Sequence, residues 1–146
     1  MKPEALKRYS LFSELNDEER EVVASLLEER KLADCKSAFR EGSESDGLVL
    51  LESGRLKLRS GRTGSVVGSL DAPDHLGAAS LFALGKREVT ALADGACVVW
   101  VLSRSALARL VDDSPRAAFR LAEAVAAELA GLARQSADSL VEHPPD

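Results

Sequence analysis

The middle of the chain consists of short apolar runs separated by glycine and serine, and this pattern constrains the fold more than any other feature. Between Leu32 and Leu102 the runs read LVLLE, RLKLRS, SVVGSL, EVTALAD and CVVWVL. RLKLRS alternates, with Leu56 and Leu58 on one face, as in a half-buried antiparallel strand. LVLLE and CVVWVL are almost continuously apolar, which is typical of strands covered on both faces. Turns are predicted at residues 52–54 and 61–64, and many short strands at this spacing favour a sandwich or barrel.

Helical patterns precede these strands. Asn16 is placed to cap a helix, and Glu19 is placed to complete a capping box. The apolar stripe that follows predicts a helix to about Arg30. The preceding stretch, YSLFSEL, is expected to form a short turn or helix that packs three apolar residues: Leu11, Phe12 and Leu15.

Two more helices are predicted after the strands. Ser103 is placed to cap a short helix, and Ser114-Pro115 opens a long one with serine at the cap and proline in the first turn. The apolar seam of the long helix recurs every three or four residues: Ala118, Leu121 or Ala122, Val125, Leu129, Leu132, Ser136 and Leu140. Such a seam packs either on its own domain or on a twin helix.

These patterns predict a single domain over residues 1–140 with three parts. Residues 1–30 are expected to be helical, residues 31–102 to form the β-barrel, and residues 103–140 to form the C-terminal helices. Residues 141–146, which include EHPPD, are expected to be a disordered tail.

The composition fits a globular domain and argues against several classes of function. The chain has 146 residues, of which 45% are hydrophobic and 29% charged, both ordinary values for such a domain. No apolar run approaches the roughly 20 residues of a membrane helix. The first residues lack the apolar core of a signal peptide. We therefore expect a cytoplasmic protein without a membrane partner.

The distribution of charge argues against direct nucleic-acid binding by this chain. The net charge is −5, and it divides into −3 over residues 1–30, +2 over residues 31–110 and −4 over residues 111–146. Proteins that grip DNA cluster lysine and arginine on the contact surface. Here both ends are acidic, and only the middle is slightly basic.

The cysteines and histidines give no support to an enzyme or a metal protein. Cys35 and Cys97 lack metal-type spacing and are expected to be reduced, buried residues. His75 and His143 lie too far apart to indicate a catalytic pair or a metal centre. We interpret His75 as a packed or surface imidazole. No nucleophile and base are arranged as in an enzyme.

Residues 75–91, HLGAASLFALGKREVTA, have the pattern of a phosphate-holding turn. A glycine is followed by small residues, a Gly-Lys-Arg and a strand-like end. The candidate ligand-binding residues are Gly77, Ala78, Ala79, Ser80, Leu81, Arg87 and Thr90, with Lys86 as a further cation. Backbone N–H groups, the Ser80 hydroxyl and the basic side chains are expected to surround a small anion. The alternative is that the basic residues are solvated loop charges and the alanines only fill space.

The order of these segments resembles the cyclic-nucleotide-binding domain family. LFSELNDEEREVV resembles the family's opening helix, and AFREGSESDGLVLLESGRLKL its early strands. SLDAPDHLGAASLF is similar to the entry of its phosphate-binding cassette, and TALADGACVVWVLSRSALARLV to its last strands and following helix. The resemblance covers residues 9–137. It implies an antiparallel β jelly roll with an N-terminal helix and a long C-terminal helix that closes on the base. It also implies cyclic AMP or cyclic GMP as ligand and dimerisation through that helix.

The cassette departs from the family pattern. The resemblance implies a glutamate after the glycine that accepts the ribose 2′-hydroxyl, and an arginine that pairs with the cyclic phosphate. Gly77 holds the glycine position, but Ala78 stands at the glutamate position and cannot accept a hydrogen bond. Loss of such a partner costs roughly 1–3 kcal/mol, or about ten- to hundredfold in affinity. Arg87 is the natural phosphate partner. The loop is about two residues shorter than in the family pattern, which places Arg87 slightly off the family position. The negative charge of Glu88 opposes a nearby phosphate.

Three functions follow from this reading. The first is a stand-alone regulatory sensor domain with weakened or altered nucleotide recognition, which signals through its C-terminal helix. The second is a degenerate module that keeps the fold for contact with a partner protein and binds no nucleotide. The third is the sensor fragment of a catabolite-activator-like transcriptional regulator, because only six residues follow Leu140 and a helix-turn-helix does not fit there. An enzyme is not expected.

Overall fold

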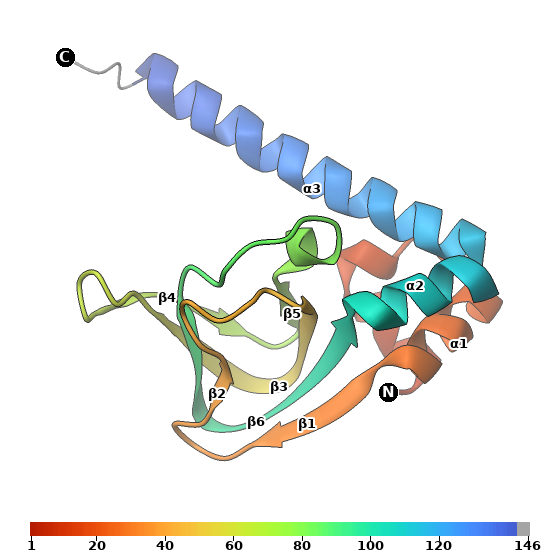
Figure 1. Ribbon diagram of the computed structural model, residues 1–146, viewed down its shortest axis with the longest axis horizontal. Coiled ribbons are helices and arrows are strands. Elements are labelled where there is room, and N and C mark those ends of the chain that lie inside the picture. Colours follow the sequence, from red (N-terminus) through yellow and green to blue (C-terminus); the bar gives the residue numbers. More distant parts are fainter. Residues whose placement is uncertain (143–146) are drawn as a thin grey trace.

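A single antiparallel sheet and a group of helices make up the computed structural model, which describes residues 1–142 (Figure 1). The elements in chain order are η1 (Pro3–Arg8), η2 (Ser10–Phe12), α1 (Asp17–Leu26), β1 (Glu28–Leu32), β2 (Ser37–Phe39), β3 (Gly47–Arg59), β4 (Val66–Asp71), β5 (Asp74–Leu76), η3 (Ala78–Leu81), β6 (Thr90–Ser103), α2 (Arg104–Asp113) and α3 (Pro115–Glu142). The expected antiparallel strands with helices before and after them are confirmed.

Two long strands organise the sheet. β6 pairs with β1, β2 and β3, and β3 pairs also with β4 and β5, all antiparallel. The predicted turn at residues 52–54 is wrong, because these residues lie inside β3. Gly54 has φ +93°, a Cβ there would lie 2.6 Å from the Ala96 carbonyl oxygen, and the β3–β6 register shifts on either side of Ser53. The glycine therefore permits a bulge inside one bent strand rather than a turn between two.

The first helix has the predicted start but a different end. The Glu19 N–H donates to the Asn16 side chain at 2.8 Å, and the Asn16 N–H donates to the Glu19 carboxylate at 2.9 Å. This is the expected capping box. The helix ends at Leu26 rather than near Arg30, because residues 28–32 pair with residues 97–101 of β6. The β1–β6 pairing thus satisfies the backbone N–H and C=O groups that would otherwise bond within a longer helix.

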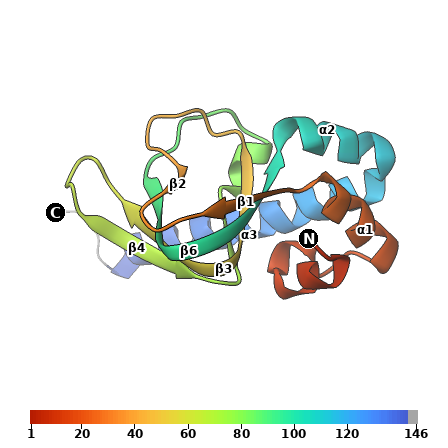
Figure 2. The ribbon, with the colours of Figure 1, turned by 90° about the horizontal axis from the view of Figure 1, so that it is seen from below.

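The core has two parts, on opposite sides of the long strands. In β3, Leu48 and Leu50 pack in a first cluster with the helices, whereas Val49 and Leu51 pack in a second cluster within the sheet. All four are at most 3% exposed, and the alternation of side chains along a strand explains why the run is continuously apolar. Figure 2 shows the helices α1 and α2 together at one end of the sheet.

The N-terminal segment is fixed to this core. Leu11, Phe12 and Leu15 are buried, as predicted. The Tyr9 hydroxyl donates to the Leu51 carbonyl at 2.9 Å, and burial raises the pKa of Tyr9 to about 12. Tyr9 is therefore a neutral hydrogen-bond donor that ties residues before α1 to β3.

The long helix α3 is buried only in its first half. Ala118, Leu121 and Val125 pack in the first cluster, which agrees with the alternative that the seam packs on its own domain. Leu129, Leu132 and Leu140 are 46–61% exposed, and Figure 1 shows this end of α3 running past the sheet. The helix includes residues 141 and 142, which had been assigned to a tail. Residues 143–146, with His143, lie outside the described residues.

Two single-residue expectations have different outcomes. Cys97 is buried, as predicted, but Cys35 is exposed. Cys35 lies in the connection between β1 and β2 and has φ +67°, so its side chain stands at a turn rather than in a strand. Trp100 packs against the first cluster and is only partly buried, and its indole N–H donates to the Glu52 carboxylate. In the described part of the chain, no helix is long and apolar enough to span a membrane.

Candidate functional site

The centre of the candidate site is Gly77, at the junction of β5 and η3. Gly77 adopts φ +75° and ψ +25°, in the left-handed region that favours glycine. A Cβ at this position would collide with Nη1 of Arg87 and lie 3.1 Å from the Gly47 carbonyl oxygen. The absence of a side chain at Gly77 therefore makes room for the Arg87 guanidinium.

The Arg87 guanidinium is partly buried and has no carboxylate partner within the described residues. Its Nη2 donates to the Gly47 carbonyl at 2.8 Å, and its Cζ lies 4.3 Å from the centre of the Phe39 ring. Its Nε is buried and has no hydrogen-bond partner among residues 1–142. Burial lowers the pKa of Arg87, and the charge of Asp46 opposes this shift. A partly desolvated cation without a carboxylate partner is stabilised by an anion placed beside it.

The backbone of a neighbouring loop fixes the position of Arg87. The Gly42 N–H donates to the Arg87 carbonyl at 2.8 Å, and the Arg87 N–H donates to the Ser43 carbonyl at 2.8 Å. The Ser45 N–H donates to the Gly85 carbonyl at 2.9 Å. These three bonds tie the residues before β3 to the residues before β6, so the guanidinium is attached to a held backbone rather than to a free loop.

Three other predicted residues of the cassette face the protein. Ala78 and Leu81 are 4% and 2% exposed and pack in the first core cluster. The Ser80 hydroxyl lies 2.6 Å from the carbonyls of both Gly47 and Gly77, and the Ser80 N–H donates to the Gly77 carbonyl at 3.0 Å. Both donors of Ser80 are thus used inside the turn. Ala79 lies between them in η3 and is partly buried.

A cavity of about 630 Å³ adjoins Arg87. Its lining includes Glu41, Arg62, Val67, Arg87, Glu88 and Val89. The volume lies within the range of roughly 300–1,000 Å³ that small-molecule sites occupy. Glu41 is held by the Gly61 N–H, which donates to its carboxylate at 3.1 Å, whereas Glu88 is exposed. The cavity is therefore lined by charges of both signs, and Glu88 lines it together with Arg87.

Thr90 and Lys86 lie apart from this centre. The Thr90 hydroxyl accepts a hydrogen bond from the Glu41 N–H at 2.9 Å, and Thr90 lines a different pocket, with Arg59. Lys86 forms a β-bridge with Glu44 and lines a pocket with Asp46 and Arg104. The structure thus brings Arg87 to Gly77 but not Lys86 or Thr90.

A hydrogen bond between His75 and Glu128 connects the start of the cassette to α3. His75 Nε2 and a Glu128 carboxylate oxygen are 2.6 Å apart, and the His75 side chain is only 10% exposed. The other ring nitrogen lies 3.9 Å from Asp74. His75 is packed, as expected, but Glu128 was not identified from the sequence. The two residues are 53 positions apart, and a glutamate on the polar side of a helix carries no signal of such a contact.

Comparison with known proteins gives the family. The model of the family described as cyclic nucleotide-binding domain matches residues 29–114. The chain therefore belongs to the cyclic nucleotide-binding domain family. No curated protein sequence matches the chain significantly.

Solved structures agree with this family. The N-terminal domain of a transcriptional regulator from Streptomyces coelicolor A3(2) is 28% identical with a TM-score of 0.79, over 93% of this chain and 94% of that chain. The catabolite activator protein of Thermus thermophilus is 26% identical with a TM-score of 0.77, over 90% of this chain and 61% of that one. The regulatory domain of Toxoplasma gondii PKA, solved with cAMP, is 25% identical with a TM-score of 0.67, over 77% and 44% of the two chains. The expected jelly-roll fold with flanking helices is thereby confirmed, and the chain is similar to the N-terminal domain of a transcriptional regulator.

Proposed function

We propose that this chain is a regulatory sensor domain that binds a cyclic nucleotide or another small anion at Arg87 and responds through α3. The single observation that carries the proposal is the Arg87 guanidinium beside Gly77, desolvated and without a carboxylate partner in the described part of the chain. In this role Arg87 pairs with the cyclic phosphate, and the adjoining cavity takes the rest of the ligand. The role is regulatory rather than catalytic.

Recognition of the sugar is expected to be weak. A methyl group at Ala78 offers no acceptor to a ribose hydroxyl, and this methyl packs in the core instead. Two carboxylates border the cavity, Glu41 and Glu88, but neither follows Gly77 in the cassette, where the family pattern has its acceptor. A ribose hydroxyl that loses water without gaining a partner lowers the affinity by roughly ten- to hundredfold.

The response is proposed to pass through the contacts between the cassette and α3. His75 in β5 pairs with Glu128, and residues of η3 pack with α3 in one cluster: Ala78, Leu81, Leu121 and Val125. A ligand that moves Gly77 or η3 therefore acts on α3 directly. A ligand shifts α3 only if it binds one of its positions more tightly than the other.

A second role, contact with another protein, is favoured by the exposed apolar side chains of α3. Leu129, Leu132 and Leu140 lie at helical spacing on the half of α3 that leaves the domain. We propose that this surface forms a homodimer or binds a partner protein. This role is compatible both with a domain that binds a ligand and with a module that binds no nucleotide. The proposal includes a cytoplasmic location and leaves open whether the chain is the sensor part of a longer regulator.

Calorimetric titration of cyclic AMP and cyclic GMP into the parent chain and an Arg87→Ala variant tests the sensor role. We expect the parent to bind one of them more weakly than micromolar. Loss of hydrogen bonds to a charged group, worth roughly 1.5–3 kcal/mol, should lower that affinity by about ten- to hundredfold in the variant. Arg109→Ala is the matched control, because this exposed arginine lies on α2, outside the cavity.

Either of two results contradicts the sensor role. Equal binding by the parent and Arg87→Ala removes Arg87 from the site. Absence of binding by a folded parent chain favours the module without nucleotide. Micromolar or tighter binding by the parent contradicts only the weakened recognition.

A further inference from the structure

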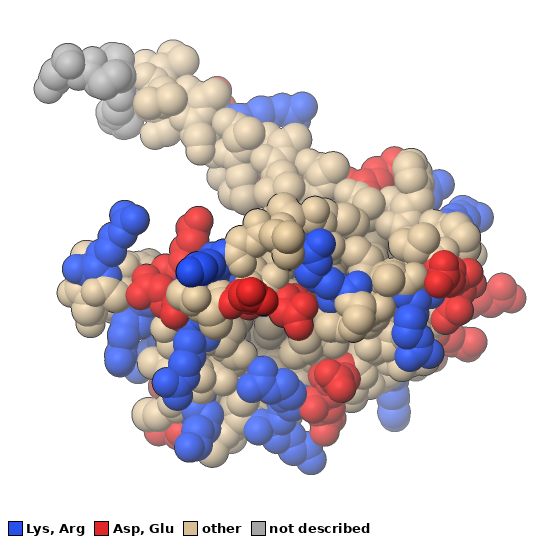
Figure 3. Space-filling view, in the orientation of Figure 1, with Lys and Arg blue, Asp and Glu red and all other residues tan. Residues whose placement is uncertain are grey.

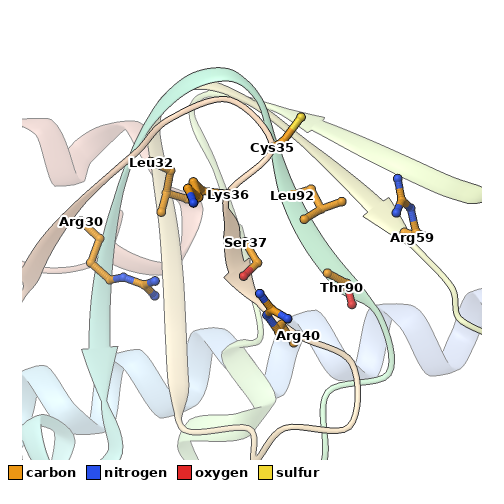
Figure 4. A pocket seen from close by; sticks show the side chains of 9 residues that line it. All are labelled: Arg30, Leu32, Cys35, Lys36, Ser37, Arg40, Arg59, Thr90 and Leu92. Atoms are coloured by element: carbon orange, nitrogen blue, oxygen red, sulfur yellow. The ribbon is translucent and has the colours of Figure 1, made fainter.

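A basic pocket lies where β1, β2 and the start of β6 meet, apart from the Arg87 cavity. It has a volume of about 540 Å³, and its lining includes Arg30, Lys36, Ser37, Arg40, Arg59 and Thr90. Figure 4 shows Arg30 and Arg59 on opposite sides of the pocket, with Ser37 and Arg40 between them. Four cationic side chains and two hydroxyl groups thus border one hollow of the surface.

The charge of this pocket is not neutralised by the protein. Its lining includes no carboxylate, and none of the four cations forms a salt bridge with a described residue. Neighbouring cations on the same sheet are paired: Lys31 with Glu29, Arg55 with Asp71 and Lys57 with Asp94. Figure 3 shows Lys and Arg side chains gathered over β1 and β2 on this face. The concentration is notable in a chain of net charge −5.

Backbone interactions keep nearby carboxylates away from the pocket. Asp34 accepts a hydrogen bond from the Gly95 N–H at 2.7 Å, and Glu41 accepts one from the Gly61 N–H at 3.1 Å. These two acidic residues are close in sequence to Lys36 and Arg40, but neither lines the pocket. Four like charges repel one another, and an anion placed among them removes that repulsion.

The framework of the pocket is held by the sheet. Ser37 pairs in register with Leu92, and Arg59 with Thr90. The Arg30 guanidinium donates to the Ala38 carbonyl at 2.9 Å, which fixes this side chain across β2. Arg30 and Arg59 therefore stand on paired strands, and Lys36 and Arg40 directly flank the short strand β2.

We propose that this pocket binds a small, multiply phosphorylated anion. Guanidinium groups match phosphate oxygens in pairs, and the Ser37 and Thr90 hydroxyls can donate to the same oxygens. The pocket is concave and has the volume of a small-molecule site, so a small ligand can fill it. Both acidic ends of the chain disfavour a nucleic acid. The pocket shares no lining residue with the Arg87 cavity, so this proposal does not depend on the proposed function.

Titration of the full chain with inorganic tripolyphosphate at constant ionic strength tests the pocket. We expect saturable binding by calorimetry, with one set of amide NMR shifts centred on Lys36, Ser37 and Thr90 that reports the pocket separately from the Arg87 site. The double variant Arg40→Gln/Arg59→Gln should lose at least about tenfold in affinity, since two charge-assisted contacts are removed. Both side chains are exposed, so the fold should persist, and circular dichroism checks this.

The controls separate the pocket from general attraction and from the Arg87 site. Arg8→Gln/Arg109→Gln removes the same charge from exposed positions outside the pocket and should leave the affinity unchanged. In Arg87→Ala the amide shifts of Lys36, Ser37 and Thr90 should saturate at the same tripolyphosphate concentration as in the parent, whatever anion the Arg87 site loses. Absence of saturation, an equal loss in the control pair, or loss of these three shifts in Arg87→Ala overturns the proposal. So does tighter binding of a DNA duplex than of tripolyphosphate at equal phosphate concentration.

Discussion

Arg87 illustrates how one side chain depends on residues that are distant in sequence. Phe39 supports its guanidinium, the Gly47 carbonyl accepts from it, and Gly77 leaves room for it. The segment that contains both residues predicted Gly77 and Arg87 as candidate ligand-binding residues, but not their contact with each other. The contribution of Phe39 was not predictable, because an aromatic residue in a short β-strand has the same pattern whether it packs on apolar groups or under a cation.

Ala78 leaves the cassette without an acceptor for a ribose hydroxyl. In Ala78→Glu the carboxylate is not stable in the first core cluster, so we expect it to leave the cluster, accept from a ribose hydroxyl and raise cyclic-nucleotide affinity by about tenfold. Calorimetry measures the affinity, and thermal unfolding reports any cost of placing a charge at a position that is 4% exposed. Ala79→Glu, on the neighbouring residue, is the control and should not gain affinity. A folded Ala78→Glu variant that binds no better than the parent contradicts the explanation of weak recognition.

The elements show where local patterns have more than one structural outcome. Alternation in residues 55–59 and the capping box at Asn16 were sufficient to predict a strand and a helix start. The sequence Glu52-Ser53-Gly54 fits a turn and a bulge equally well, and only the pairing of β3 with β6 decides for the bulge. The end of α1 was misplaced for the same reason, because the residues after Leu26 gain their partners from a strand about 70 positions away.

A double-mutant cycle on His75 and Glu128 measures the connection between β5 and α3. We expect His75→Ala, Glu128→Ala and the double variant to give a coupling of about 0.5–1.5 kcal/mol in the free energy of unfolding, as for a partly buried hydrogen bond. Urea denaturation measures it, and amide hydrogen exchange should become faster in α3 around residue 128. The exposed pair Arg120 and Glu123, three residues apart on the same helix, is the control and should couple by about 0.3 kcal/mol. A His75–Glu128 coupling no larger than this control contradicts the connection.

At the scale of the molecule, charge and apolar surface lie in different places. The basic pocket faces outward from β1 and β2, whereas the exposed leucines lie on the far half of α3. Overall composition predicted neither arrangement, because a net charge sums over all surfaces. The periodicity of the seam did predict its apolar face, but not how the face divides between the domain and solvent. The boundary between the packed and the exposed part of this face lies at the point along α3 where the helix leaves the domain surface.

Dimerisation through α3 is testable by mass. We expect light scattering of the parent chain to give twice the monomer mass, and Leu129→Glu/Leu132→Glu to give the monomer mass, because two charges would then be buried in the interface. The control Phe119→Glu changes an apolar residue that is 62% exposed on the first half of the same helix, and it should remain dimeric. A monomeric parent chain refutes the dimer.

The helix α3 is continuous over 28 residues, from a half that packs in the core to a half that stands clear of it. Fourteen residues follow Glu128, and at about 1.5 Å each they reach about 21 Å beyond it. The outer half of α3 therefore extends from the domain surface as a rigid continuation of the packed half. A tilt too slight to disturb the packing of Leu121 and Val125 sweeps the far tip through a much wider arc. In the proposed response, small displacements near Gly77 become large ones at the end of α3, where another molecule can bind.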